Sequence, residues 1–240
     1  MRRLALILLA ALFAHPAMGA ATEAIVSANY TLPTTRYDHA ILGDAIEYGA
    51  LDLRLDDGRN LRLTLPENRV FEDIAPRLAD LDGDGAPEVI VVETDLGRGA
   101  RLAVYGAAGL IAATPFIGRT HRWLAPIGAA DLDGDGRVEI AYIDRPHLAR
   151  TLKVWRFHDG RLTLVAKLGG LTNHQIGQDH ITGGIRTCGQ TPEIITLNAG
   201  WTQVMATRLQ AGRLQSRALG PFTGSVTGPM AVRDALRCWI

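Results

Sequence analysis

The stretch ADLDGDGAPEVIVVE occupies residues 79–93, and it returns 51 residues later as ADLDGDGRVEIAYID at residues 130–144. Each copy places four acidic side chains at positions 1, 3, 5 and 9 of a loop. Two glycines in each loop, Gly83 and Gly85 in the first, permit the tight turn that brings alternate side chains to one point. An apolar run typical of a buried strand follows each loop. Two copies with one spacing indicate a repeat, whereas a single copy would be equally consistent with a solvated turn.

Oxygen ligands at this spacing suit a hard cation such as calcium, which takes roughly six to eight of them. We therefore expect two calcium sites, in which the residue at position 7 contributes its backbone carbonyl. The full EF-hand is not expected, because position 12 is Val91 or Tyr142 where a bidentate glutamate would be required. The expected ligands are Asp80, Asp82, Asp84, Ala86 and Glu88 in the first loop, and Asp131, Asp133, Asp135, Arg137 and Glu139 in the second.

The N-terminal segment MRRLALILLAALFAHPAMGA combines two arginines, an apolar stretch and small residues at a cleavage site. This pattern predicts a secretory signal peptide over residues 1–21, followed by a single domain over residues 22–240 in the periplasm or outside the cell. No later segment is long and apolar enough to span a membrane. Removing Arg2 and Arg3 leaves 23 basic and 25 acidic residues, a formal charge of −2. That balance argues against a nucleic-acid partner.

The chain has two cysteines, Cys188 and Cys238. An even number in an exported protein favours a disulfide, and two buried thiols are the alternative. A metal site built on them is not expected, because no thiol or histidine lies nearby at zinc spacing.

Short apolar segments turn at Gly58, Gly109, Gly160 and Gly212, which are 51, 51 and 52 residues apart. The runs on either side of these glycines alternate in polarity, which is typical of β-hairpins, and helical periodicity is absent. One unit therefore reads as four antiparallel strands, best seen over residues 123–130, 138–143, 152–157 and 162–166. Four-stranded units at this period predict an all-β propeller of about four blades. The repeat units are expected near residues 38–66, 72–115, 123–167 and 179–218.

The segments DLDGDGAPEVIVV and DLDGDGRVEIAYI resemble the FG-GAP/VCBS repeats of integrin alpha-chain-type propellers and of many exported bacterial proteins. The resemblance covers the repeat unit. It implies a propeller in which the Asp-rich loop between the first two strands of a blade binds calcium. The sequence departs from the family because the Phe-Gly and Gly-Ala-Pro signatures are missing and because integrin-type propellers have more blades.

The first and last units differ from the middle two. Aligning Glu193 with Glu88 and Glu139 places no aspartate at the ligand positions of the last unit, so we expect a structural blade there. The first unit lacks a counterpart of the inner strand. We expect residues 231–240 to supply it, with residues 231–239 pairing with residues 38–43. Such a strand would close the ring, and a Cys188–Cys238 disulfide would latch it.

With acidic loops and hairpins on one face, the remaining connections lie on the opposite face and contain most of the histidines. One interpretation is that these connections are solvated loops without a binding role. The alternative is a ligand site, because imidazole and guanidinium groups suit an anionic or sugar-like ligand. The candidate ligand-binding residues are His39, Asp44, His121, Arg122, His147 and His174.

No nucleophile elbow, phosphate loop, dinucleotide fingerprint or zinc-spaced cluster is present. The leading hypothesis is an exported calcium-binding propeller that serves as a binding module for a protein, a glycan or a small anionic ligand. The alternative is a periplasmic hydrolase or lyase that uses the histidine-bearing face. The fold alone does not decide between them.

Overall fold

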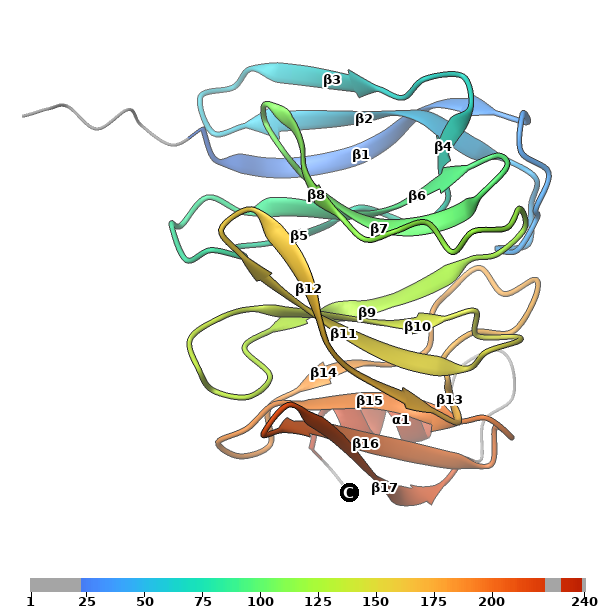
Figure 1. Cartoon of the computed structure of the whole chain (residues 1–240), viewed down its shortest axis with the longest axis vertical. Coiled ribbons are helices and arrows are strands. Elements are labelled where there is room, and N and C mark those ends of the chain that lie inside the picture. The colour runs from blue at the N-terminus through green and yellow to red at the C-terminus, as the bar shows by residue number, and fades with distance from the viewer. Residues whose placement is uncertain (1–22, 223–229, 239–240) are drawn as a thin grey trace, which may run out of the picture.

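A computed structural model describes residues 23–222 and 230–238 of the chain. The predicted signal peptide, residues 1–21, lies outside them. The described residues form antiparallel β-sheets and one short helix, which confirms the all-β class. Figure 1 shows the sheets stacked along the long axis, in chain order from the N-terminal strands at the top to the fourth sheet with its helix at the bottom. That helix, the only one among the described residues, is too short to cross a membrane.

The first two units share one eight-stranded sheet. The short strand β4 joins them, because it pairs with both β2 and β6. The first unit comprises β1 (Ile25–Thr34), β2 (Glu47–Leu55) and β3 (Asn60–Thr64). The second comprises β4 (Arg69–Phe71), β5 (Arg77–Ala79), β6 (Glu88–Asp95), β7 (Gly99–Gly106) and β8 (Gly109–Ala113).

The third unit is a four-stranded antiparallel sheet in the order β12-β11-β10-β9, as predicted. The fourth unit is a five-stranded sheet, in which β13 and β14 both pair with β15. The third sheet comprises β9 (Leu124–Ala130), β10 (Glu139–Asp144), β11 (Thr151–His158) and β12 (Arg161–Gly169). The fourth comprises β13 (Leu171–Thr172), β14 (Gly184–Arg186), β15 (Glu193–Asn198), β16 (Gln203–Gln210) and β17 (Arg213–Pro221).

Alternate residues of the central strands pack against opposite neighbours. In β6, Val89 and Val91 join the core shared with the first unit, whereas Ile90 and Val92 join the core shared with the third. The same alternation in β10 and β15 builds the cores farther along the stack. Strands buried on both faces must be apolar at every position, which explains the unbroken runs VIVV and IAYI.

The C-terminal segment does not form the predicted closing strand. Residues Met230–Leu236 form helix α1, which contacts β14, β15 and β16 of the fourth sheet. Val232 and Ala235 are buried there against Ile195 and Leu197. The segment is rich in helix formers and repeats its apolar residues at helical spacing, so it covers an apolar sheet face that would otherwise meet water. The predicted partner, residues 38–43, is a loop between β1 and β2.

The first and fourth units meet through loops and not through a shared sheet. The backbone N–H of Gly177 donates to the carbonyl of Ile41 at 3.1 Å. Gly177 belongs to residues 173–183, a segment that interrupts the inner strand of the fourth unit between β13 and β14. The two loops therefore bridge the first and last units on one side of the stack, at the right in Figure 1.

The first unit begins earlier than residue 38, with β1 paired along β2. Matching the hairpins at the four glycines makes β1 the second strand of its unit, and the described residues include no innermost strand for it. The face of this unit that points away from the stack is polar, and Asp52 and Arg62 form an exposed ion pair on it. A polar outer face is the feature that allows a terminal repeat to end an array in water.

Candidate functional site

Each acidic loop brings three of its four predicted carboxylates together, and the fourth, Asp84 or Asp135, is not part of the cluster. Oxygen atoms of Asp80, Asp82 and Glu88 lie within 4.8 Å of one another, and so do those of Asp131, Asp133 and Glu139. Asp80 accepts hydrogen bonds from the backbone N–H groups of Gly83 and Gly85 at 2.8 and 3.1 Å. The positive φ angles of these glycines, 80° and 87°, allow that curl.

The second acidic cluster has a counterion from a neighbouring strand. The guanidinium of Arg156 on β11 contacts Asp133 at 2.7 Å, Asp135 at 3.0 Å and Glu139 at 2.6 Å. Gly106 stands opposite Glu88 in the strand register of the second unit, where Arg156 stands opposite Glu139. Among the described residues, the first loop therefore has no equivalent counterion.

The donor set fits a hard cation. Every side chain in the clusters offers carboxylate oxygen, the ligand atom that calcium prefers. In the second loop, Oδ1 of Asp133 is buried without a hydrogen-bond partner among the described residues. In the first, burial and the charges of Asp82 and Asp84 raise the pKa of Glu88. A divalent cation would relieve that repulsion. The carbonyl-ligand role of Ala86 and Arg137 stays a prediction.

The fourth unit balances the equivalent glutamate with arginines. Glu193 is buried and accepts from Arg186 at 2.6 Å, Arg208 at 2.8 Å and Arg217 at 2.9 Å. Ile185, which pairs with Ile194, precedes a loop that has no aspartate. Guanidinium groups thus lower the pKa of Glu193 against the effect of burial. This unit keeps the strand and its glutamate, and no acidic cluster surrounds them among the described residues.

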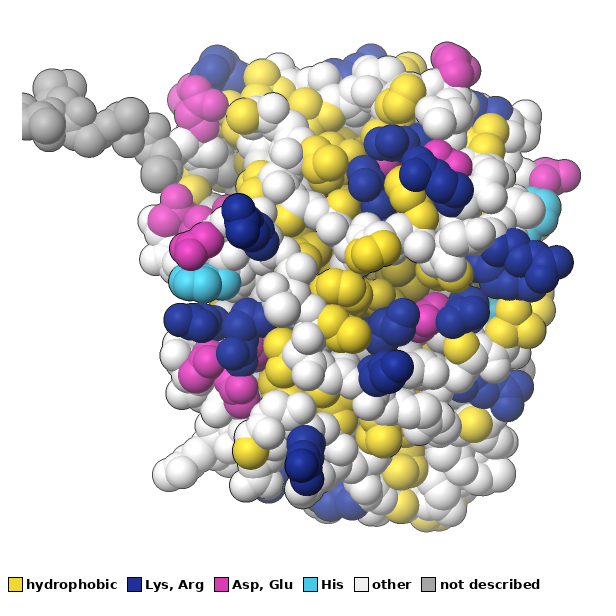
Figure 2. Space-filling model, in the orientation of Figure 1, with side chains coloured by type: hydrophobic (Ala, Val, Ile, Leu, Met, Phe, Trp, Pro, Cys, Tyr) yellow, Lys and Arg dark blue, Asp and Glu magenta, His cyan; other side chains and the backbone are white. Residues whose placement is uncertain are grey.

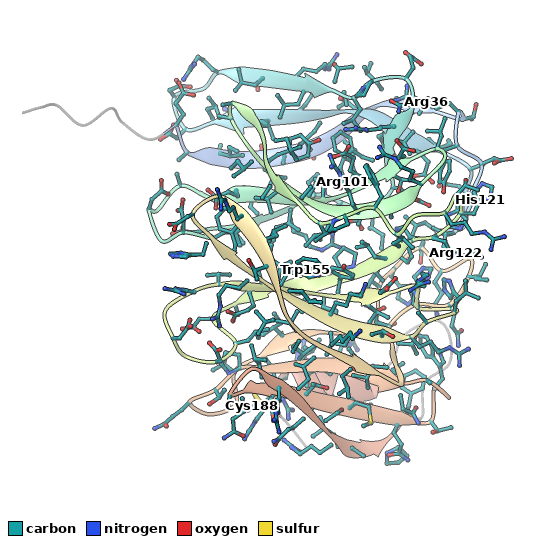
Figure 3. The ribbon with its side chains drawn as sticks, viewed as in Figure 1. Arg36, Arg101, His121, Arg122, Trp155 and Cys188 are labelled. Atoms are coloured by element: carbon teal, nitrogen blue, oxygen red, sulfur yellow. A yellow bond between two sulfur atoms is a disulfide. The ribbon has the colours of Figure 1, made fainter. Side chains whose placement is uncertain are left out.

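The histidine-bearing loops form a pocket of about 230 Å³ on the other side of the stack. All four units contribute to its lining through His39 and Ile41, residues 121–123, residues 145–148 and Ile176. Figure 3 labels His121 and Arg122 at this edge, at the right, whereas the acidic loops lie at the left in Figure 1. In Figure 2 basic side chains gather at the same right-hand edge beside histidine and hydrophobic ones.

The hydrogen bonds of two histidines fix their tautomers. Nε2 of His174 lies 2.9 Å from the carbonyl oxygen of Gln178, and Nδ1 lies 3.1 Å from Nε2 of His147. A carbonyl only accepts, so His174 donates through Nε2 and accepts through Nδ1. Burial lowers the pKa of both histidines to about 4, so both are neutral at pH 7. His147 therefore donates through Nε2 and keeps an unprotonated Nδ1.

His39 rests on a buried carboxyl group. Its Nδ1 lies 2.5 Å from Oε1 of Glu72, whose other oxygen accepts from the hydroxyl of Thr94. Burial raises the pKa of Glu72 to about 8, and burial followed by the charge of Arg122 lowers that of His39 to about 4. Both directions favour neutral partners, with the proton on Glu72. His39 then carries its own proton on Nε2.

Two arginines line the pocket, and their charges are balanced differently. Arg145 makes two hydrogen bonds to Asp144, at 2.8 and 3.1 Å, and Asp144 also pairs with Lys153. Arg122 donates only to the backbone carbonyl of His121 and meets no carboxylate among the residues that the structure describes. The pocket is thus lined by one cation without a carboxylate partner among the described residues, Arg122, and by the neutral imidazoles of His39 and His147.

The backbone around the pocket is strained. His121 and Arg145 have φ angles of 53° and 47°, and Ala40 in the facing loop has 49°. Such left-handed conformations cost side-chain-bearing residues roughly 1–3 kcal/mol and occur most often at functional sites. The hydroxyl of Tyr37 accepts from the N–H of His121 at 2.7 Å and helps to hold this conformation.

Of the six predicted ligand-binding residues, His39, His121, Arg122 and His147 line this pocket. His174 is fully buried behind it, in contact with His147, and Asp44 lines a neighbouring hollow with His180. Sequence reasoning missed Glu72, Leu148 and Ile176. Glu72 follows an apolar strand and lies 33 residues from His39 in the sequence, so no local pattern connects the two side chains. The ligand-binding role of all these residues stays a prediction.

The stacked antiparallel sheets and the two acidic loops define an all-β repeat protein with two carboxylate clusters. Residues 78–142 match the family model of the FG-GAP-like repeat. This segment, which runs from β5 to β10, therefore carries an FG-GAP-like repeat.

A search of curated proteins gave no match. Among solved structures, the chain is similar to an exotype rhamnogalacturonan lyase, YesX, with a TM-score of 0.48 and 17% sequence identity. The similarity covers 78% of this chain and 44% of that one, so the chain spans less than half the length of the lyase.

Proposed function

We propose that this protein is an exported, calcium-stabilised propeller-type module that binds a small anionic ligand in the histidine-bearing pocket. The four units act as its blades. One observation carries the proposal: loops from all four units converge on a pocket in which Arg122 has no carboxylate partner among the described residues. A site assembled from every repeat at one face, with a free guanidinium, is suited to an anion.

Calcium has a structural role in this proposal. Four carboxylates in each loop repel one another, and a cation held between them would remove that repulsion and fix the turn before β6 or β10. Export is supported by the Cys188–Cys238 disulfide, because disulfides persist in oxidising compartments.

The calcium test uses calorimetry and thermal unfolding of the mature protein. We expect two binding events, the first loop being tighter because Arg156 already neutralises part of the second. Excess chelator should lower the melting temperature. Asp82→Ala and Asp133→Ala should each remove one event, while Asp56→Ala, an exposed carboxylate outside the loops, should remove neither. Unchanged melting in chelator and no heat of binding would show that the loops are solvated turns.

The pocket test is an NMR titration with acetate that follows the imidazole signals of the pocket. The wild type and Arg119→Gln, a nearby exposed arginine that does not line the pocket, should respond alike. Arg122→Gln should not respond. An equal response of Arg122→Gln and the wild type would reject the anion site.

A hydrolase or lyase is the second candidate, and the His147–His174 pair favours it. A neutral imidazole whose tautomer is fixed by a second group is the arrangement of a general base. Incubating the protein in D₂O with carboxylic acids that bind separates the two functions. Deuterium appearing at carbon next to the carboxylate, and disappearing in His147→Gln, would establish proton abstraction. Binding without exchange supports the module.

A further inference from the structure

The pocket combines its cation with apolar side chains at the surface. Ile176 is 71% exposed and Leu148 is 61% exposed, the two highest values among the large hydrophobic residues that the structure describes. Both line the pocket, although they come from different units. Single exposed apolar residues are ordinary on protein surfaces, but here the two most exposed ones flank the same cavity. The ligand therefore has an apolar part as well as an anionic one.

The polar groups of the pocket specify where the ligand donates and where it accepts. Arg122 and Nε2 of His39 are donors, which suits the two oxygens of a carboxylate. His147 offers the pocket a hydrogen-bond acceptor. Its Nε2 proton is committed to His174, and its Nδ1 has no partner among the described residues, so it accepts. A ligand that satisfies all three groups carries a carboxylate and a separate N–H or O–H donor.

The cavity volume limits the size of the ligand. About 230 Å³ is below the roughly 300–1,000 Å³ typical of pockets that enclose drug-sized molecules. The pocket holds either a small molecule or the end of a longer one.

From these features we propose that the pocket recognises a carboxylate whose neighbouring carbon bears both a hydrogen-bond donor and an apolar group. This proposal rests on the proposed anion-binding function of the same pocket. An N-acylated apolar amino acid has this chemistry, and so does the C-terminal residue of a polypeptide, in which the amide N–H, the carboxylate and the apolar side chain share one carbon. The carboxylate contacts Arg122, the N–H donates to His147, and the side chain lies between Leu148 and Ile176.

The test is calorimetric titration of the mature, calcium-loaded protein with N-acetyl-L-leucine and three analogues, each of which removes one feature. N-acetyl-L-leucinamide lacks the carboxylate, 4-methylpentanoate lacks the N–H, and N-acetylglycine lacks the apolar group. Each should bind roughly tenfold more weakly or worse, the loss expected for one interaction of this kind. If N-acetyl-L-leucine binds no more tightly than all three analogues, the inference is overturned.

Protein variants locate the binding. Arg122→Gln and Ile176→Ser should each weaken N-acetyl-L-leucine binding about tenfold or more, while Arg119→Gln and Leu110→Ser should not. Leu110 is a matched control because it is 47% exposed at a hairpin outside the pocket. Loss of affinity in the controls equal to that in Arg122→Gln and Ile176→Ser would contradict the proposal.

Two further arms separate the outcomes. A pentapeptide ending in leucine with a free carboxylate, compared with its C-terminally amidated form, distinguishes the sources: tighter binding than N-acetyl-L-leucine indicates a polypeptide end, and equal or weaker binding indicates a free acid. Acetate separates the anion-binding site from the wider ligand recognition proposed here. If acetate binds through Arg122 and N-acetyl-L-leucine binds no better, the anion site stands and this inference falls. If neither binds, both fall.

Discussion

Three glutamates at the start of equivalent strands show how single residues change the electrostatics of a repeat. Glu88 faces aspartates alone, Glu139 faces aspartates and Arg156, and Glu193 faces arginines alone. The strand and its buried carboxylate are retained in each case, while the compensating charge differs. A buried carboxylate requires a partner, and either a bound cation or a guanidinium meets that requirement.

A second group of buried carboxyls lies between the first two units, near the histidine-bearing pocket. Glu47, Glu72 and Asp73 are each at most 3% exposed. Burial, followed by the charges of Glu72, Asp44 and Asp73, raises the pKa of Glu47 to about 9. Glu47 is therefore protonated in the native protein at neutral pH, whereas in the unfolded chain it ionises near its ordinary value of 4.5.

Glu47→Gln should stabilise the protein increasingly as pH rises from about 5 to 8. In the wild type the unfolded state loses this proton and the native state keeps it, so unfolding becomes easier with rising pH. Glutamine retains the neutral shape without that penalty. Thermal unfolding at pH 8 should show a melting temperature higher by roughly 2–4 °C for each kcal/mol gained. Glu67→Gln, whose side chain is 97% exposed, should show no such trend. Equal curves for Glu47→Gln and the wild type would mean that Glu47 is ionised in the native state.

At the scale of elements, the inner strands differ among the units and the site depends on that difference. The inner strand β9 is continuous, whereas residues 72–76 separate β4 from β5 and residues 173–183 separate β13 from β14. The first interruption carries Glu72 and the second carries His174 and Ile176. Breaks in pairing at sheet edges place side chains where a regular strand would not. Here they supply Ile176 to the pocket and place Glu72 and His174 behind the lining residues His39 and His147.

Helix α1 covers the exposed apolar face of the fourth sheet, and two contacts hold it. The Cys188–Cys238 disulfide joins its C-terminal end to the segment between β14 and β15, and Arg186 donates to the carbonyl of Ala235 at 2.7 Å. Figure 3 shows Cys188 at the left, on the side of the acidic loops. A helix of seven residues has little stability alone, so its position depends on these contacts and on packing.

Reduction of the disulfide should lower the melting temperature. The bond spans 50 residues, and a loop of that length corresponds to a stabilisation of about 4 kcal/mol by chain entropy, less any strain. Reductant should lower the melting temperature of the wild type to that of the Cys188→Ser/Cys238→Ser variant, whose own melting it should not alter. A wild type insensitive to reductant would show that packing alone holds α1.

At the scale of the whole molecule, the described residues show no strand that closes the stack into a ring. One end is the polar face of the first sheet, and the other is covered by α1. The first and fourth units contact each other where residues 38–46 meet residues 173–183. This contact also positions His39, Ile41 and Ile176 around one pocket. Joining the ends by loops therefore shapes the site as well as the fold.

A matched pair of glycines tests that contact. Gly43 and Gly118 have nearly the same φ, 98° and 99°, so alanine imposes the same backbone strain at both. A Cβ at Gly43 would also lie 3.0 Å from the carbonyl oxygen of Gly177, whereas at Gly118 it would meet nothing within 4 Å. Gly43→Ala should therefore lower the melting temperature more than Gly118→Ala, and it should weaken acetate binding. Equal effects of the two substitutions would show that the loops are not held together.

The sequence by itself determined the local structure. Two acidic loops, four hairpins at a period of about 51 residues and unbroken apolar runs define the strands and their order, because turns and strand burial depend on neighbouring residues. The tendency of residues in equivalent connections to share one face also follows from the repeat, which is why the histidines could be placed on the side opposite the acidic loops.

The tertiary structure decided the rest. The C-terminal segment is a helix because the far face of the fourth sheet needs an apolar cover, and no pattern within residues 231–239 reveals that face. Glu72 meets His39, and Leu148 lies on the same pocket as Ile176, through contacts between units that are distant in the chain. Such contacts depend on how whole sheets stack and on which charges burial leaves to be balanced, and these are properties of the assembled fold.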